Sequence, residues 1–299
     1  MEVRDLWYTS PKAALGRVPG CAILRGVHCD FASHECTAVM GPSGCGKSTL
    51  LEVVGQRRVS GTASGSVLLD GTHCKRVSSS LMAFAAQDCE SSRDETLSTL
   101  EALTFAAELR RDAASSAWDV ERCVRRVVRE LELDACCDTR LGALSGGESR
   151  RVAIGEELVG GPRVLLADEL TTGLDSASAV VALRVVRTLA SSGVTVATSL
   201  HQPPFCVFDG AEPLVERLVL LVDGETAYQG PAKDALATLR GTDPRAQRGP
   251  SNGADEQYSN VADAWLEVLR DAKAVELCVA RGSPRPSRAR FSNSVLVCV

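Results

Sequence analysis

The feature that most constrains this chain is a glycine-rich loop that follows a short apolar run. The run, Cys36 to Met40, predicts a strand and leads directly into Gly41-x-x-x-x-Gly46-Lys47-Ser48. Glycines let backbone N–H groups curl around phosphate oxygens, and a helix that starts at the end of the loop adds positive potential. In such a loop the lysine reaches the β- and γ-phosphates and the serine hydroxyl ligates Mg²⁺. The spacing therefore predicts a nucleotide site formed by Gly41, Pro42, Ser43, Gly44, Cys45, Gly46, Lys47, Ser48 and Thr49.

Two acidic residues at the end of a second strand supply the complementary chemistry. Val164 to Ala167 predicts a buried strand, and Asp168 and Glu169 follow it directly. Alone, such a pair is usually a solvated turn or a helix cap. With a phosphate loop about 120 residues upstream, we expect Asp168 to hold Mg²⁺ through water. Glu169 is then expected to polarise the water that attacks the γ-phosphate.

Strands alternate with helical patterns along the chain. A third strand, Val194 to Thr198, ends just before His201, and Ser176 to Ala190 predicts a helix with Asp175 as its N-cap. This alternation favours an α/β fold, with a parallel sheet that carries helices on its faces.

The stretch from about residue 91 to 144 differs, because it contains no strand signal. Valines at 120, 124, 127 and 128 and Leu131 recur at helical spacing, with arginines at 122, 125, 126 and 129 between them. The arginines allow a nucleic-acid patch, but their acidic neighbours Glu121, Glu130 and Glu132 favour a solvated helix face. We interpret the stretch as a helical subdomain inserted into the α/β core.

Composition restricts the other possibilities. The 299-residue chain has a net charge of −5, which gives no overall attraction to nucleic acid or to an anionic membrane. Its 12 cysteines show no C-x-x-C spacing, so no zinc knuckle or disulfide framework is expected. The longest uncharged stretch, Thr188 to Phe208, contains two prolines and predicts a strand and a turn, so we expect no membrane span.

A second glycine pair decides which kind of nucleotide domain to expect. At residues 144–148 a hydroxyl and two glycines stand at a predicted helix start, in the sequence Leu144-Ser145-Gly146-Gly147-Glu148. A simple helix cap would give the same pattern. A chain needs only one phosphate cradle per nucleotide. Together with the first loop, this motif resembles the ABC ATPase family. The resemblance implies that residues 144–148 contact ATP bound to an opposite subunit.

The resemblance assigns roles to further residues. It implies that Gln87, 40 residues after Lys47, senses Mg²⁺ and touches the membrane partner, and that His201 contacts the γ-phosphate. Gly173-Leu174-Asp175 matches the D-loop. The aromatic that stacks on adenine is either Tyr8 or Trp7, and Tyr8 aligns better.

Longer stretches resemble the G subfamily, in which the nucleotide domain comes first. They include TLEALTFAAELR, SGGESRRVAIGEELV, TSLHQPP and AYQGP. The resemblance implies a P-loop NTPase core with an N-terminal antiparallel β subdomain over residues 1–240, and a helical subdomain at about 91–160. Residues 241–299 are expected to form a linker, a short helix and a disordered tail.

The same resemblance implies an ATPase that uses ATP and Mg²⁺ and powers export. Its expected partners are a half-transporter membrane domain, in the same gene product or as a separate subunit, and a second nucleotide-binding domain, identical or different; no nucleic acid is expected. This would place the chain on the cytosolic face of a membrane. One departure is Leu170, where the family usually has proline.

Two alternatives stay open from the residues. One is a soluble ABC ATPase that is not coupled to transport, and the other is a binding module that does not hydrolyse ATP, which the presence of Lys47, Asp168, Glu169 and His201 disfavours. We also expect the positive surroundings of Cys45 to lower the pKa of its thiol.

Overall fold

The computed structural model describes most of the first 235 residues. These are residues 1–11, 20–57, 60–74, 81–86, 93–110, 117–201, 203, 207–208 and 213–235. The chain divides into two compact units: the first contains Met1–Phe31, Thr37–Arg76 and Ser199–Val299, and the second contains Ala32–Cys36 and Val77–Thr198. The predicted linker, short helix and tail after residue 240 lie outside the described residues.

The first unit contains an antiparallel sheet of four strands in the order β2-β1-β4-β5. The strands are β1 (Glu2–Thr9), β2 (Ala22–Asp30), β4 (Thr62–Leu69) and β5 (Thr72–His73). Asp70 and Gly71 have positive φ angles of 51° and 75° in the β4–β5 turn. This is the conformation that a two-residue hairpin needs and that Asp-Gly readily adopts. The N-terminal antiparallel subdomain is thus confirmed.

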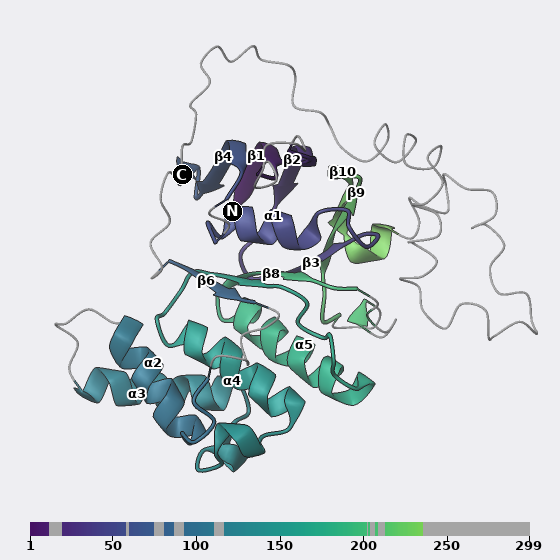
Figure 1. The fold of residues 1–299 in the computed structure, drawn as a ribbon. Helices are drawn as coiled ribbons and strands as arrows, with labels where there is room; N and C mark the ends of the chain where they lie inside the picture. The colour runs from purple at the N-terminus through teal and green to yellow at the C-terminus, as the bar shows by residue number, and fades with distance from the viewer. Residues whose placement is uncertain are drawn as a thin grey trace, which may run out of the picture. The chain divides into compact units, whose positions relative to one another are not determined.

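The first unit also carries the phosphate loop on a parallel strand pair. Strand β3 (Cys36–Met40) is buried throughout and pairs in parallel with β9 (Arg217–Val222) from Thr37 with Arg217 to Met40 with Leu220. Strand β10 (Glu225–Pro231) returns antiparallel to β9 through a second Asp-Gly turn. Helix α1 (Lys47–Val54) follows the loop and packs against β2 (Figure 1).

The second unit consists of parallel strands and helices that lie on one side of them in Figure 1. Strands β6 (Met82–Ala85), β7 (Val164–Ala167) and β8 (Thr195–Ser199) pair in parallel in the order β8-β7-β6. The predicted strands at 36–40 and 164–167 are confirmed residue for residue, and the third is shifted by one residue. The mainly parallel core therefore agrees with the α/β prediction.

The described residues between 93 and 158 contain the helices of the predicted helical subdomain. They are α2 (Thr99–Arg110), α3 (Ala117–Glu130), η1 (Asp134–Cys136), η2 (Leu141–Ala143) and α4 (Gly146–Leu158). The apolar face of α3 is buried, with Val127 fully inaccessible to solvent. Its arginines form ion pairs along the helix, Arg125 with Glu121 and Arg126 with Glu130. This arrangement is the predicted solvated face.

Helix α5 (Ser176–Ser191) begins as the sequence predicts. The Asp175 carboxylate accepts hydrogen bonds from the N–H groups of Ala177 at 3.0 Å and Ser178 at 2.9 Å. These hydrogen bonds hold the pKa of Asp175 below its usual range. The cap fixes the start of α5 directly after the Gly173-Leu174-Asp175 motif.

Helix α4 packs closely against two neighbours at a glycine. A Cβ atom at Gly155 would lie 2.8 Å from a Leu103 methyl and 2.9 Å from a Leu131 methyl, and both leucines are fully buried. Alanine normally stabilises a helix interior relative to glycine by about 1 kcal/mol. Overpacking a filled core costs about 1–3 kcal/mol. We therefore expect Gly155→Ala to destabilise the domain by about 1 kcal/mol, seen as a lower urea midpoint.

Gly160→Ala is the matched control. A Cβ atom there would find its nearest atoms at 3.7 Å, an ordinary contact distance. Its urea midpoint should stay close to that of the wild type. A Gly155→Ala variant as stable as Gly160→Ala would contradict the close packing of α4 against α2 and α3.

Candidate nucleotide-binding site

The loop after β3 adopts positive φ angles, a conformation that favours glycine, at three positions. Gly41, Gly44 and Gly46 have φ angles of 153°, 80° and 107°. At Gly41 a Cβ atom would lie 2.1 Å from the carbonyl oxygen of Leu221 in β9, so a side chain has no room there. Ser43 and Gly44 are exposed at the tip, while Pro42 and Ser48 are half-buried. The loop thus curls back over the start of α1.

Lys47 lies inside this curl. It is the first residue of α1 and is 6% exposed, and its Nζ donates hydrogen bonds to the carbonyls of Gly41 at 2.9 Å and Pro42 at 3.1 Å. Gly46 is the N-cap of α1 and has no side chain to occupy the first N–H groups of the helix. An ammonium group and a helix N-terminus therefore share one loop, which is the arrangement that binds phosphate.

The second unit carries the acidic pair at the end of β7. Asp168 is 6% exposed and its N–H donates to the Ala85 carbonyl at the end of β6, at 2.9 Å. Glu169 is half-buried and has a positive φ of 49°, which is unusual for a residue with a side chain. Such backbone strain is typical of functional sites.

A residue that the sequence analysis did not single out holds this turn. Arg150 of α4 is 4% exposed and donates to the carbonyls of Ala86, Asp168 and Glu169, at 2.8, 2.7 and 3.2 Å. A sequence signal existed, because Arg150 shares a helical face with the buried residues Gly147, Ile154 and Leu158. A charged side chain on the apolar face of a helix predicts that hydrogen-bond acceptors are buried beside it.

The glycine pair at residues 146–147 begins α4 with a capping box. The Ser145 hydroxyl accepts from the Glu148 N–H at 3.4 Å, and the Glu148 carboxylate accepts from the Ser145 N–H at 2.8 Å and hydroxyl at 2.7 Å. These bonds to Ser145 hold the pKa of Glu148 below its usual range. Leu144 is half-buried, while Ser145 and Gly146 are exposed. The residues that cap α4 are therefore also the exposed residues of the 144–148 motif.

The remaining predicted residues are divided between the units. Lys47, Ser48 and His201 belong to the first unit, whereas Asp168, Glu169 and residues 144–148 belong to the second, and the structure shows each set within its own unit. His201 is half-buried and follows β8 closely in sequence. Gln87 lies outside the described residues.

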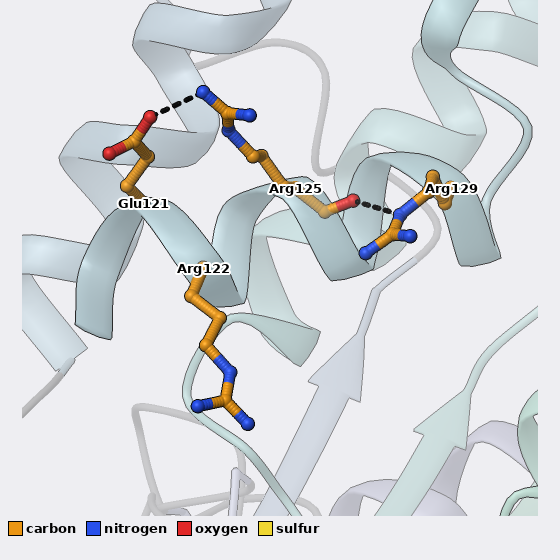
Figure 2. Close-up of a pocket in the computed structure, with 4 residues that line it drawn as sticks. All are labelled: Glu121, Arg122, Arg125 and Arg129. Carbon is orange, nitrogen blue, oxygen red and sulfur yellow. Dashed lines mark hydrogen bonds and ion pairs between the residues drawn. The ribbon is translucent and has the colours of Figure 1, made fainter. Parts of the chain in front are cut away.

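A shallow hollow on the surface of α3 is not part of this chemistry. Glu121, Arg122, Arg125 and Arg129 line it. Figure 2 shows that Arg125 is paired with Glu121, that Arg129 donates to the Arg125 carbonyl, and that Arg122 points away from them. None of the predicted nucleotide residues lines the hollow, which belongs to the solvated face of α3.

Comparison with known proteins decides the family of this site. Residues 24–172 match the family model described as ABC transporter. The chain is 40% identical over 205 residues to ABC transporter G family member 11 of Arabidopsis thaliana, covering 67% of this chain and 28% of the relative. It is 32% identical over 249 residues to the broad substrate specificity ATP-binding cassette transporter ABCG2 of Bos taurus, covering 80% and 35%. The chain carries an ABC-type nucleotide-binding domain.

This nucleotide-binding domain resembles those of the G subfamily, as the sequence predicted. The chain spans about a third of the length of these curated relatives. Among solved structures it is similar to the bacterial ABC transporter cassette MJ0796, with a TM-score of 0.60 and 22% identity over 77% of this chain and 98% of that one. The cassette cbiO1 of Clostridium perfringens is similar with a TM-score of 0.63 and 21% identity, over 83% of this chain and 96% of that one. These likenesses confirm the fold.

The prediction that Tyr8 stacks on adenine is wrong. Tyr8 is 2% exposed, and its hydroxyl donates to the Ser60 carbonyl, so its ring has no free face. The neighbouring Trp7 is 45% exposed, with its Nε1 donating to the Asp5 carboxylate at 2.8 Å. Trp7, the alternative from sequence, is the aromatic of this pair that remains accessible.

The expectation of a lowered pKa at Cys45 is also wrong. Burial raises the pKa of the Cys45 thiol above its ordinary value, and this outweighs the lowering by Lys47 and by backbone N–H groups. The side chain is 4% exposed and is turned toward Gly41, whose Cβ, if present, would lie 2.7 Å from the sulfur. The thiol is therefore packed under the loop.

Alkylation kinetics test this placement. At pH 7, N-ethylmaleimide should modify Cys45 about tenfold more slowly than the exposed Cys21, because the reactive thiolate is scarce and access is poor. Mass spectrometry of peptides after timed quenching measures both rates in one chain. Equal labelling of Cys45 and Cys21 would contradict the buried orientation, and a Cys45→Ser chain verifies the peptide assignment.

Proposed function

We propose that this domain binds ATP with Mg²⁺, hydrolyses it, and thereby powers export through a membrane domain. The observation that carries the proposal is the loop at residues 41–48, in which Lys47 lies inside the curl at the start of α1. A nucleoside triphosphate is the ligand that such a loop suits, because the N-terminus of α1 and the Lys47 ammonium belong to one loop. One neighbour of this fold was solved in a post-hydrolysis state with ADP and Pi.

The residues divide the work of hydrolysis. Lys47 would exchange its loop carbonyls for β- and γ-phosphate oxygens and neutralise their charge. Glu169 would accept a proton on its carboxylate from the attacking water. His201 would contact the γ-phosphate, and Gln87 would report on it to the membrane partner. Trp7 replaces Tyr8 as the proposed adenine contact.

The donor set suits Mg²⁺. Asp168 supplies a buried carboxylate and Ser48 a half-buried hydroxyl, and Mg²⁺ prefers such oxygen ligands together with phosphates and water. Gln87 is the third proposed ligand. When bound, Mg²⁺ would offset the negative charge on the transferred phosphoryl group.

The signature residues suit a second copy of the domain as partner. Ser145 and Gly146 are exposed at the N-terminus of α4, a 13-residue helix whose positive end faces outward. The MJ0796 cassette was solved as a dimer. We propose that residues 144–148 complete the ATP site of a second nucleotide-binding domain, identical or different.

The proposed role in transport rests on relatives that are named transporters. No helix among the described residues is both long and apolar enough to cross a membrane. We propose that a membrane domain, in the same gene product or as a separate subunit, completes the transporter and holds this domain at the cytosolic face. The relatives compared above give no support to the alternative of a soluble ATPase.

Substitution of the proposed base separates chemistry from binding. Glu169→Gln should lower kcat for ATP hydrolysis by about 10²- to 10⁴-fold, because the water loses its proton acceptor. Its affinity for MgATP should stay close to that of the wild type. Lys47→Ala should instead weaken binding itself, measured as loss of thermal stabilisation by MgATP.

Two exposed residues provide controls. Glu121→Gln and Lys233→Ala remove the same charges from the surface of α3 and from the chain after β10, so both should bind and hydrolyse ATP like the wild type. Unchanged turnover in Glu169→Gln would remove that residue from the proposed role. Full stabilisation of Lys47→Ala by MgATP would contradict the proposed site.

A further inference from the structure

Arg150 occupies an unusual place for a charged side chain. It lies in the second turn of α4, five residues after Ser145, and is 4% exposed. Burial of a guanidinium is costly unless its N–H groups find acceptors. The position therefore has to be justified by what the side chain holds.

The two terminal nitrogens of Arg150 reach two different strand ends. Nη1 donates to the carbonyl of Ala86, one residue after β6, at 2.8 Å. Nη2 donates to the carbonyls of Asp168 and Glu169, just after β7, at 2.7 and 3.2 Å. Hydrogen bonds from a charged donor are stronger than neutral ones, and the planar fork fixes the directions of its donors. One side chain thus fastens both strand ends to α4.

The turn that Arg150 holds is conformationally strained. Glu169 has φ of 49°, a region that residues with a Cβ atom adopt only at a cost. Such a conformation persists when its surroundings over-determine it. Arg150 binds the Asp168 and Glu169 carbonyls on both sides of the Glu169 backbone, and therefore contributes directly to that restraint.

We infer that Arg150 is a positioning residue, which aims the Glu169 carboxylate by fixing the backbone on either side and ties that turn to the helix begun by Ser145–Glu148. The inference deepens the proposed function and rests on it for the role of Glu169. A displacement of the signature end of α4 would reach the turn through this side chain.

Two substitutions of Arg150 and one control test the inference. Arg150→Met keeps the length but removes every donor, and Arg150→Lys keeps one nitrogen, which cannot span both strand ends. Arg110→Met is the control for the β7 end, because Arg110 also binds α4, through two hydrogen bonds to Glu157. Glu157 in turn accepts from the Phe84 N–H in β6 at 3.3 Å, so this control does not cover the β6 end. All three are compared in the full 299-residue chain.

Turnover and affinity provide the first readout. Arg150→Met should lower kcat for ATP hydrolysis by about 10- to 100-fold, since small misplacements of a catalytic group have effects of this size. The dissociation constant for MgATP should change less than about threefold, because Lys47 and its loop are untouched. Arg150→Lys should fall between Arg150→Met and the wild type. Arg110→Met should keep kcat within about threefold of the wild-type value, even where its thermal midpoint falls as far as that of Arg150→Met.

Hydrogen exchange provides a second readout that needs no catalysis. Amides of residues 164–172 should exchange faster in Arg150→Met than in the wild type, and should exchange as in the wild type in Arg110→Met. If the wild type binds but does not hydrolyse ATP, the proposed function fails and exchange alone decides the role of Arg150. Wild-type exchange in Arg150→Met would overturn the inference. So would a kcat loss in Arg110→Met equal to that of Arg150→Met at the same thermal midpoint.

Discussion

The site depends on one steric constraint, the absence of a side chain at Gly41. The parallel pairing of β3 with β9 brings the Leu221 carbonyl to within 2.1 Å of where a Cβ atom would be. Because the backbone passes this point, the loop can curl over the start of α1 and place its carbonyls around the Lys47 ammonium. A larger residue would push the loop off β9 and open that curl. The geometry of the phosphate site thus begins in the register of two strands.

The two units hold an unfavourable backbone by different means. In the phosphate loop the positive φ angles fall on glycines, for which they cost little. At the end of β7 the positive φ falls on Glu169, which needs its carboxylate for the proposed chemistry and cannot be replaced by glycine. The buried fork of Arg150 supplies the restraint there. These two means fix Lys47 at the start of α1 and Glu169 just after β7.

The sequence predicted those parts of the fold that are governed by local rules. The strands at 36–40 and 164–167, the loop glycines and the Asp175 cap all follow from periodicity, glycine spacing and capping chemistry. The prediction that Tyr8 stacks on adenine failed because strand β1 contains a bulge. Asp5 has a φ of 49°, and the register shifts between Arg4 and Trp7. The bulge places Val3, Leu6 and Tyr8 on one buried face, a result that strict alternation does not give.

The thiol pKa of Cys45 and the hydrogen bonds of Arg150 depend on burial in the folded domain, which the sequence did not reveal. At Cys45 the positive neighbours were correctly expected to lower the pKa, but desolvation has the larger effect. Arg150 contacts residues 64 and 18 positions away in the chain, and no local pattern encodes such distant acceptors. In both cases tertiary packing decided the electrostatics.

The number of ATP molecules bound by one chain tests the central claim most directly. Both the loop at 41–48 and the N-terminus of α4 have the chemistry of phosphate sites, but we propose that only the first binds ATP by itself. Isothermal titration of the 299-residue chain with ATP and Mg²⁺ should give one ATP per chain, with clearly weaker binding in Lys47→Ala. Wild-type affinity in Lys47→Ala, or a wild-type chain that binds no ATP, would contradict the account.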